Sequence, residues 1–535
     1  MKHFYLSTLF IMGSFATVIG QNRTPFTVKF SPEYEYPKKH EALGFYGTDE
    51  TGYAALSFQE DKEIVIQNLD KSFVVKKTTP IDLHDYPKSM QYDGVYQVGG
   101  KTYWFYSNYD KKEEVQHLEA REVDLKNSKI LSKSTELVAT KSKLVGSMEY
   151  HSYGIVAIGE VTNKFKFYYD VAHTKILIMY MLEKEFKSDK KNKDRIGLVM
   201  VDSSMNKLWS KEIVMPYFES EMSILDYQPD SKGNAYILVK KYETTSKKEV
   251  TKDGAVNSSY EIIRLDKDGN MKNIKMSLDN ILIKSLNIYE TADHTPVCVG
   301  YYSGVVKKNA GIDGVFCARI DEDGTISKFK KGTYEFPTDL LMQNESNRTA
   351  RKAEKKEENG DDVQLSSITP RKVIFNPDGS LIIVGEVFYV TSYTSTSNGH
   401  TYTTYIDHYC DVYVTKIAAD GSLSWVKKIA KHQVRNGSVG AFAMGDDFYL
   451  FYMDNGNNLF LKADEQPHTF NGKSAMLTCV GIDKHGAVTK SKLLDMRDED
   501  EDVYPVAFEK INETLIISRA IKNKRTSKIM TLKKS

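Results

Sequence analysis

A short β-hairpin motif recurs along the 535-residue chain. It combines an alternating apolar strand, a tight turn that ends in Asp-Gly or His-Gly, and a second alternating strand. Four clear copies are "RLDKDGNMKNIKM" from Arg264, "RIDEDGTISKFKK" from Arg319, "KIAADGSLSWVKKI" from Lys416 and "GIDKHGAVTKSKL" from Gly481. The aspartate before the glycine is expected to hydrogen-bond the turn backbone, and the glycine tolerates positive φ. Repetition of one such unit restricts the chain to a repeat architecture.

A second type of hairpin alternates with the first, with copies at Tyr96, Asp226, Val373 and Ala441. Two alternating hairpins make a four-stranded meander, and meanders repeated every few tens of residues are typical of a β-propeller. Separate β-sandwiches would need long linkers, which the sequence lacks. The sequence therefore predicts an all-β chain with a single β-propeller over residues 21–535.

The number of blades follows from the first strand of each unit. Eight positions qualify, which favours eight blades and leaves seven as the alternative: Ala42, Met90, Phe165, Met222, Lys284, Arg371, Val439 and Val503. The last unit supplies only three strands, "VYPVAFEK", "ETLIISRA" and "TSKIMTLKK". We expect an N-terminal strand, Pro25 to Phe30, to complete it and close the ring, since closure removes exposed sheet edges.

Two insertions interrupt the repeat. Residues 342–364 are dense in charge and lack apolar periodicity, which predicts a solvated loop or frayed helix. Residues 386–412 have Asn398 and Gly399 at their middle, the strongest short-range hairpin signal. The arms are too long for a blade edge, so this hairpin is expected to project beyond the propeller.

The projecting hairpin carries the candidate ligand-binding residues. Folding about Asn398 and Gly399 places Tyr389 opposite His408, Tyr393 opposite Thr404 and Ser397 opposite His400. Because side chains alternate, one face holds Tyr389, Tyr393, His400, Tyr402, Ile406 and His408. The aromatic and histidine side chains of this face could stack on a sugar or a peptide; the alternative is a brace against the neighbouring blade.

The N-terminus and the composition indicate an exported protein. Lys2 and His3 precede a short apolar run that ends with small residues at Val18 and Gly20, as in a cleaved signal peptide over residues 1–20. An uncleaved anchor helix is the alternative, and no later segment resembles a transmembrane helix. The 73 Lys and Arg against 72 Asp and Glu give no basic footprint for nucleic acid.

The 4 cysteines do not indicate a disulfide framework. Cys298 and Cys317 lie on neighbouring predicted strands, where a disulfide is one alternative. Cys317 and Cys479, however, occupy the position that Ile262 and Val414 take in other copies of the hairpin. This equivalence favours buried thiols.

The sequence contains no complete catalytic or metal motif. No nucleophile elbow, zinc-protease helix or phosphate loop is present. His408 and Cys410 point the same way on one strand but have no assured third ligand. Acidic residues at Asp266 and in Asp495 to Asp502 leave calcium as an alternative, although acidic turns recur simply to form the turn. The sequence thus predicts no cofactor.

The stretch from Gly379 to Gln433 resembles segments of exported, poorly characterised β-propeller proteins of Bacteroidetes-type bacteria. The resemblance implies the propeller fold and an envelope location, in the periplasm or at the outer-membrane periphery, with secretion as an alternative. It implies no catalytic residues.

Three functional hypotheses follow. The missing motifs favour a non-catalytic propeller that binds a protein or glycan partner in the cell envelope. The second hypothesis is a hydrolase or lyase that acts on polysaccharide or peptide, which would require carboxyl groups with raised pKa converging at the channel mouth. The third is a purely structural envelope component, which predicts no pocket of ligand size.

Overall fold

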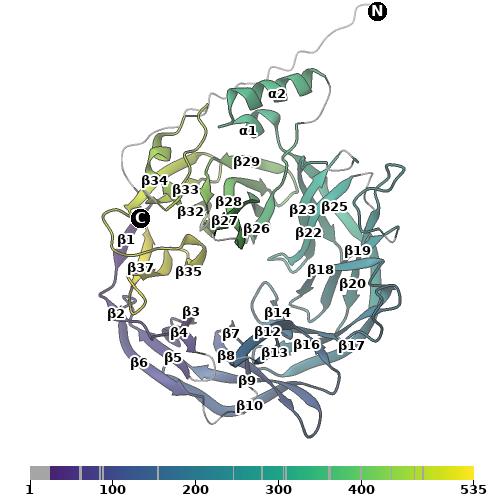
Figure 1. The fold of residues 1–535 in the computed structure, drawn as a ribbon, viewed down its shortest axis with the longest axis vertical. Helices are drawn as coiled ribbons and strands as arrows, with labels where there is room; N and C mark the ends of the chain where they lie inside the picture. The colour runs from purple at the N-terminus through teal and green to yellow at the C-terminus, as the bar shows by residue number, and fades with distance from the viewer. Residues whose placement is uncertain are drawn as a thin grey trace, which may run out of the picture.

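Eight four-stranded antiparallel sheets, arranged as the blades of a ring, make up the described part of the chain (Figure 1). The computed structural model describes residues 24–535 except for 60–62, 84–85, 87–89, 154–155, 245, 277, 279–280, 305, 308–309, 324, 360–362, 398–399, 435–436, 463 and 473–474. The predicted eight-bladed β-propeller is therefore confirmed. The predicted signal peptide lies outside the described residues. No described helix is long and apolar enough to cross a membrane.

Each blade is a meander whose strands follow one another from the centre of the ring to its rim (Figure 1). Blade 1 comprises β3 (Glu41–Thr48), β4 (Gly52–Gln59), β5 (Glu63–Leu69) and β6 (Val75–Asp82). Blade 2 comprises β7 (Gln91–Val98), β8 (Lys101–Asp110), β9 (Val115–Asp124) and β10 (Lys129–Thr140). Blade 3 comprises β14 (Phe165–Tyr169), β15 (Lys175–Leu182), β16 (Lys193–Asp202) and β17 (Lys207–Phe218), with β11 (Leu144–Val145) also paired to β15. Blade 4 comprises β18 (Met222–Pro229), β19 (Ala235–Tyr242), β20 (Ser258–Leu265) and β21 (Met271–Met276).

The second half of the ring repeats this arrangement. Blade 5 comprises β22 (Leu282–Glu290), β23 (Pro296–Ser303), β24 (Gly314–Ile320) and β25 (Ile326–Glu335). Blade 6 comprises β26 (Thr369–Phe375), β27 (Leu381–Ser397), β28 (His400–Ile417) and β29 (Leu423–Ile429), with β30 (Gln433–Val434) also paired to β28. Blade 7 comprises β31 (Gly440–Met444), β32 (Asp447–Asn455), β33 (Ala475–Ile482) and β34 (Val488–Asp495), with the 3-10 helix η1 (Gly456–Phe460) after β32. Blade 8 comprises β35 (Glu509–Asn512), β36 (Leu515–Ile521), β37 (Thr526–Lys534) and β1 (Phe26–Phe30).

The two ends of the chain close the ring together. Strand β1 pairs antiparallel with β37 from Phe26 opposite Lys534 to Phe30 opposite Met530, as predicted. A second short strand, β2 (Tyr34–Glu35), pairs with the other end of β37. The N-terminal strand thus supplies the outer strand that blade 8 lacks.

Apolar side chains fill the space between neighbouring blades. The described residues form eight buried clusters, one at each blade–blade interface. Both faces of a blade are therefore buried, which requires middle strands that are almost continuously apolar. In β23, for example, all eight residues are buried. This packing also decides whether Cys298 and Cys317 form a disulfide. Cys298 packs between blades 4 and 5 and Cys317 between blades 5 and 6, so they face opposite sides of one sheet and remain buried free thiols.

The repeated turns differ from the prediction in one respect. Gly269 has a φ of 78°, as a tight turn requires. The carboxylate that accepts hydrogen bonds from the turn, however, belongs to Asp266, whose Oδ1 receives the backbone N–H groups of Asp268 and Asn270. Asp483 forms the same contacts in its copy. The turn-forming aspartate in these two copies lies three residues before the glycine rather than directly before it.

One local prediction needs correction, one hairpin was not predicted, and the charged insertion takes the helical one of its two predicted forms. The stretch from Val503 is a loop and a 3-10 helix, η2 (Pro505–Ala507), and strand β35 begins only at Glu509, because Pro505 has no N–H for a sheet ladder. An additional hairpin of β12 (Ser147–Tyr153) and β13 (Val156–Thr162) precedes blade 3. The charged insertion at 342–364 contains helix α2 (Asn347–Glu358), which follows α1 (Thr338–Met342). Ser346 caps α2 through the N–H of Thr349, and Ala353 is buried.

Ring closure generates the first testable prediction. Phe26 is 1 % exposed and packs edge-on against Tyr449 and Phe451, with ring centroids 4.9 and 5.2 Å away. We expect Phe26→Ala to lower the free energy of unfolding of the whole domain by about 3–5 kcal/mol. Urea unfolding followed by tryptophan fluorescence measures this effect, with Thr27→Ala on the exposed side of β1 as the control. A wild-type transition for Phe26→Ala would show that the ring does not depend on β1.

Candidate functional site

The insertion in blade 6 forms a long two-stranded ribbon. Strands β27 and β28 contain 17 and 18 residues, whereas no other described strand exceeds 12. Strand β26 pairs with β27 only up to Glu386, and β29 pairs with β28 only up to Val412. The segment between these two residues, 387–411, is called the ribbon below. Eleven or twelve residues per arm span about 35 Å.

The register of the ribbon matches the prediction. Tyr389 lies opposite His408, Tyr393 opposite Thr404, and Ser397 opposite His400; the two loop residues themselves lie outside the described part. The fractional exposure of the predicted tyrosines is 42 % for Tyr389, 50 % for Tyr393 and 55 % for Tyr402. His400 is placed only by its register.

The opposite face of the ribbon is also aromatic. Tyr405 is 71 % exposed and Val390 is 49 % exposed on that face. The alternation of side chains along the strands also implies this second face, although the predicted binding residues all lie on the first. Both faces of this hairpin therefore expose large side chains, which are common at interaction surfaces.

His408 belongs to the foot of the ribbon rather than to its exposed part. Its ring stacks on Tyr389 at 4.5 Å, and its Nε2 lies 2.9 Å from Thr391 Oγ1. Its Nδ1 lies 3.1 Å from Nε2 of His432, whose Nδ1 in turn lies 3.2 Å from Thr469 Oγ1. The foot of the ribbon is thus a brace, whereas Tyr389, Tyr393 and Tyr402 remain exposed.

A buried network of charges fixes the foot. Glu386 and Lys431 have fully buried side chains and form an ion pair of 2.6 Å. Arg371 Nε donates to the second carboxylate oxygen of Glu386 at 2.7 Å. Lys431 also donates to Gln433 Oε1 at 2.6 Å and to the carbonyl of Tyr409 at 3.1 Å. Burial lowers the pKa of Lys431, an effect that Glu386 opposes.

A β-bulge lies next to this network. The register of β27 against β28 shifts between Glu386 and Phe388: Val387 in β27 lies opposite two residues of β28, Cys410 and Asp411, so the extra residue belongs to β28. A bulge bends a strand and redirects the residues that follow it. The Arg371 guanidinium lies 5.7 Å from the Phe388 ring and 5.6 Å from the Tyr409 ring, which covers the bend with aromatic surface. The direction of the ribbon is therefore set by packing.

The helical insertion is attached to the same blade. The buried ammonium group of Lys428 donates to the carbonyls of Leu341 and Gln343 at 3.0 and 2.7 Å, at the end of α1. The same group pairs with Glu345 and Asp411 at 3.0 and 3.1 Å. Helix α1 thus packs against β29 at the rim of blade 6, α2 packs on α1, and both lie outside the ring (Figure 1).

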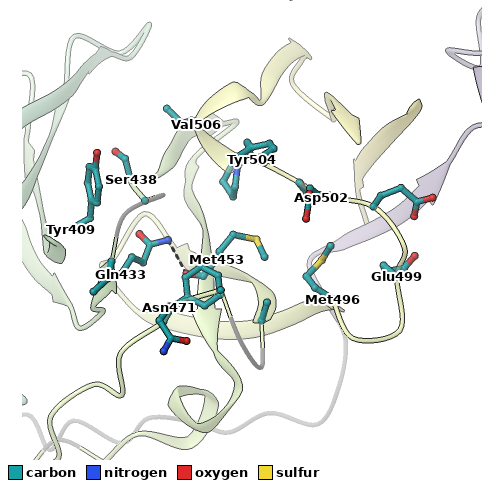
Figure 2. Close-up of a pocket in the computed structure, with 18 of the residues that line it drawn as sticks. Tyr409, Gln433, Ser438, Met453, Asn471, Met496, Glu499, Asp502, Tyr504 and Val506 are labelled. Carbon is teal, nitrogen blue, oxygen red and sulfur yellow. Dashed lines mark hydrogen bonds between the residues drawn. The ribbon is translucent and has the colours of Figure 1, made fainter. Parts of the chain in front are cut away.

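A pocket of about 660 Å³ opens beside the foot of the ribbon (Figure 2). Tyr409, Gln433 and Val434 line it on the side of blade 6, and residues 499–506, the loop before β35, line the other side. Its floor includes Met453 and Phe470 from blade 7. This volume lies in the range of small-ligand sites.

The acidic run at Asp495 to Asp502 borders this pocket, but Asp495 and Glu501 have separate partners. Asp495 pairs with Arg497, and the buried Glu501 pairs with Lys528 at 2.7 Å. Burial and the neighbouring Glu501 raise the pKa of Glu499. Within the described residues, no three His, Cys, Asp or Glu side chains lie close enough together to hold a metal ion, and His408 with Cys410 is no exception.

Three carboxyl groups on the innermost strands have raised pKa values, and the repeat pattern of the sequence does not single them out. Burial raises the pKa of Asp93 in β7 and of Glu509 in β35 to about 7, and it also raises the pKa of Asp226 in β18. Glu509 accepts the N–H of Phe45 in blade 1 at 3.2 Å, and Asp226 accepts the N–H of Ile288 in blade 5 at 3.1 Å. These two carboxylates therefore connect neighbouring blades.

A second pocket of about 860 Å³ lies between blades 1, 2 and 8, where Glu509 forms part of the wall. Gln97 bridges the same region by accepting from the N–H and donating to the carbonyl of Gly47, at 3.0 and 3.2 Å. In the sequence, Asp93, Asp226 and Glu509 stand out only as single acidic residues within apolar strands.

Comparison with known proteins gives similarity of fold alone. No protein-family model and no curated protein match the chain. The β-propeller domain of the Trilobed protease from Pyrococcus furiosus aligns with 86 % of this chain and 98 % of its own length, at 11 % identity and a TM-score of 0.34. The WD40 domain of SCAP from fission yeast aligns with 96 % and 97 %, at 7 % identity and 0.35. A protein of unknown function from Dyadobacter fermentans aligns with 82 % and 97 %, at 10 % identity and 0.31.

The buried network generates a prediction about stability. Lys431→Met removes the partner of one buried carboxylate oxygen of Glu386 and leaves only the pair with Arg371, so we expect it to lower the free energy of unfolding by about 3 kcal/mol. The double variant Glu386→Gln/Lys431→Met should recover part of that loss, because the glutamine still accepts from Arg371. Urea unfolding measures both, with the exposed Lys133→Met as control. A double variant less stable than Lys431→Met would contradict this account.

The raised pKa of Glu509 generates a prediction about pH. Its folded-state pKa of about 7 exceeds the ordinary 4.5, so the native state binds this proton more tightly than the unfolded state. The contribution of the Glu509 carboxyl group to the free energy of unfolding therefore falls as the pH rises from about 4.5 to 7. Glu509→Gln retains an acceptor for Phe45 and should gain stability relative to wild type, on the order of 1 kcal/mol, between pH 5 and pH 8. Urea unfolding of Glu509→Gln and wild type at pH 5 and at pH 8 measures this gain, and the exposed Glu50→Gln serves as the control.

Proposed function

We propose that this chain is an exported, non-catalytic β-propeller that binds a protein or glycan partner in the cell envelope through the ribbon of blade 6. The observation that carries the proposal is the set of exposed apolar side chains on a preorganised hairpin. Tyr389, Tyr393, Tyr402 and Tyr405 are all more than two-fifths exposed on one element. Tyrosine supplies a large, amphipathic contact area at a low cost in conformational entropy.

The foot of the ribbon supports this role. Buried ion pairs are costly to form and are retained where they fix a geometry. Here the pair of Glu386 with Lys431 lies beside the bulge at Cys410 and Asp411, and His408 holds the foot against His432. A ribbon fixed in this way loses little further freedom when it binds.

The location rests on the signal-like N-terminus and on the resemblance to exported propellers, which agree with each other. The pocket beside the ribbon is of ligand size, whereas a purely structural envelope component would need none.

A hydrolase or lyase acting on polysaccharide or peptide is the second candidate, and the raised pKa values of Asp93 and Glu509 favour it. The bond from Phe45 gives Glu509 a structural role that needs no substrate. If the wild-type protein cleaved a polysaccharide or a peptide and the Asp93→Asn variant did not, this alternative would be selected.

The proposal is tested by thermal unfolding of residues 21–535 with panels of peptides and of glycans. A ligand at about 100 times its Kd adds ~2.7 kcal/mol to the folded state, so binders raise the Tm. We expect binders to lose this shift in the variant Tyr389→Ser/Tyr393→Ser/Tyr402→Ser. Tyr109→Ser, at an equally exposed site on blade 2, is the matched control. An unchanged shift in the triple variant would remove the ribbon from the binding site.

A further inference from the structure

The edges of the ribbon differ from the outer edges of the blades. Outer blade strands carry lysines, which discourage pairing with another chain. The outer strands of blades 1 to 5 and of blade 7 each carry at least two, whereas the outer strand of blade 6 carries Lys427 and has Lys428 buried against the end of α1. The pairs are Lys76 and Lys77, Lys129 and Lys133, Lys207 and Lys211, Lys272 and Lys275, Lys328 and Lys330, Lys490 and Lys492. The ribbon, residues 387–411, contains no lysine, arginine or proline at all.

The register identifies which backbone groups of the ribbon are unpaired. Ser397 and His400 flank a two-residue loop and therefore form a hydrogen-bonded pair, and such pairs alternate with non-hydrogen-bonded ones along the ladder. Thr394 opposite Thr403 is a non-hydrogen-bonded pair, so the N–H and C=O groups of both residues point outward. Phe388 is an even number of residues from Thr394 on the same strand, so its backbone groups should also point outward. Its carbonyl accepts a hydrogen bond from the Ser367 hydroxyl outside the ribbon, which agrees with this assignment.

The two edges are not equivalent. Strand β30 already adds to the outer edge of β28, with Val434 opposite His408 and Gln433 opposite Tyr409. Beyond it, no described strand pairs with the outer edge of β28 from Thr401 to Tyr405. This edge therefore accepts a strand at its foot and leaves the next positions open.

We propose that the outer edge of β28, Thr401 to Tyr405, takes up an extended segment of a partner polypeptide by β-strand addition. The inference rests on the proposed binding role of the ribbon and specifies its mode. Backbone groups of Thr401, Thr403 and Tyr405 supply the hydrogen bonds, and exposed Tyr402 and Tyr405 contact the side chains of the segment on opposite faces.

Chemistry and size favour a polypeptide over the other occupants. A ladder of alternating N–H and C=O groups fits a second backbone and not a sugar ring. Pairing with the ribbon of a second copy would engage only the short edge from Thr401 to Tyr405 of each chain, whereas a stable interface involves ~800 Å² per partner. A separate segment can continue past β30, since Tyr409 and Val434 also line the 660 Å³ pocket, whose far wall carries Glu499 and Tyr504 (Figure 2).

The test uses the full mature chain and a library of random twelve-residue peptides. Peptides selected on wild type are measured by fluorescence anisotropy against two variants, Thr403→Pro and Thr394→Pro, which lie directly opposite each other in the ribbon. Each proline removes one outward N–H and leaves the pairing inside the ribbon intact. We expect Thr403→Pro to weaken binding by about tenfold or more and Thr394→Pro to bind as wild type.

A second variant and a backbone probe keep the test decisive if a proline disturbs the fold. Thr403→Lys, which introduces the charge found on the outer blade strands, should weaken binding in the same direction. N-methylation of alternate residues of the selected peptide should also abolish it. Circular dichroism and Tm values equal to wild type establish that each variant is folded.

Four outcomes would overturn the inference. Equal affinities for Thr403→Pro and wild type would exclude this edge while leaving the ribbon's tyrosines as the binding surface. A glycan that shifts the Tm while no peptide is enriched would replace strand addition but keep the proposed function. A wild-type dimer in light scattering that Thr403→Pro dissociates would assign the edge to a second copy. Absence of any peptide or glycan binding would overturn both proposals.

Discussion

The pairing of β1 with β37 is the contact on which the rest of the structure depends. Each blade buries both faces against its neighbours, so no blade has a complete core until the one on either side is in place. A four-stranded sheet with both faces apolar cannot remain exposed to water, and a ring solves this only when its last gap is filled. Phe26 occupies that gap between blades 7 and 8.

Blade number and blade order could be predicted because they depend on local pattern, and ring closure could be predicted because the last unit lacks a strand that Pro25 to Phe30 can supply. The turns at Gly269, Gly421 and Gly486 indicate hairpins within a few residues, and alternation fixes which residues face the core. The register of the ribbon follows for the same reason, since a two-residue loop leaves one pairing for every later residue. For the charged insertion the sequence left a loop or a frayed helix open, because the buried contact of α2 rests on Ala353 in a run of charge.

Contacts between distant parts of the chain were beyond local pattern. Nothing near Glu386 or Lys431 in sequence indicates that they meet, or that Arg371 joins them. Lys428 and the end of α1 are separated by 87 residues. Likewise, Asp93 and Glu509 resemble ordinary polar residues in strands until burial gives them raised pKa values. The candidate site was thus predictable in its exposed tyrosines and unpredictable in the charges that hold it.

The strand that completes the final blade is among the first to be synthesised. Phe26 to Phe30 must wait for Thr526 to Lys534 before it finds its partner, which gives this one contact nearly the largest sequence separation the chain allows. Contacts of that kind slow folding, because the entropy of closing the loop is lost before any interaction compensates it. During synthesis an apolar strand therefore remains without its sheet while seven blades accumulate behind it, and this interval is when the chain most needs protection from its neighbours.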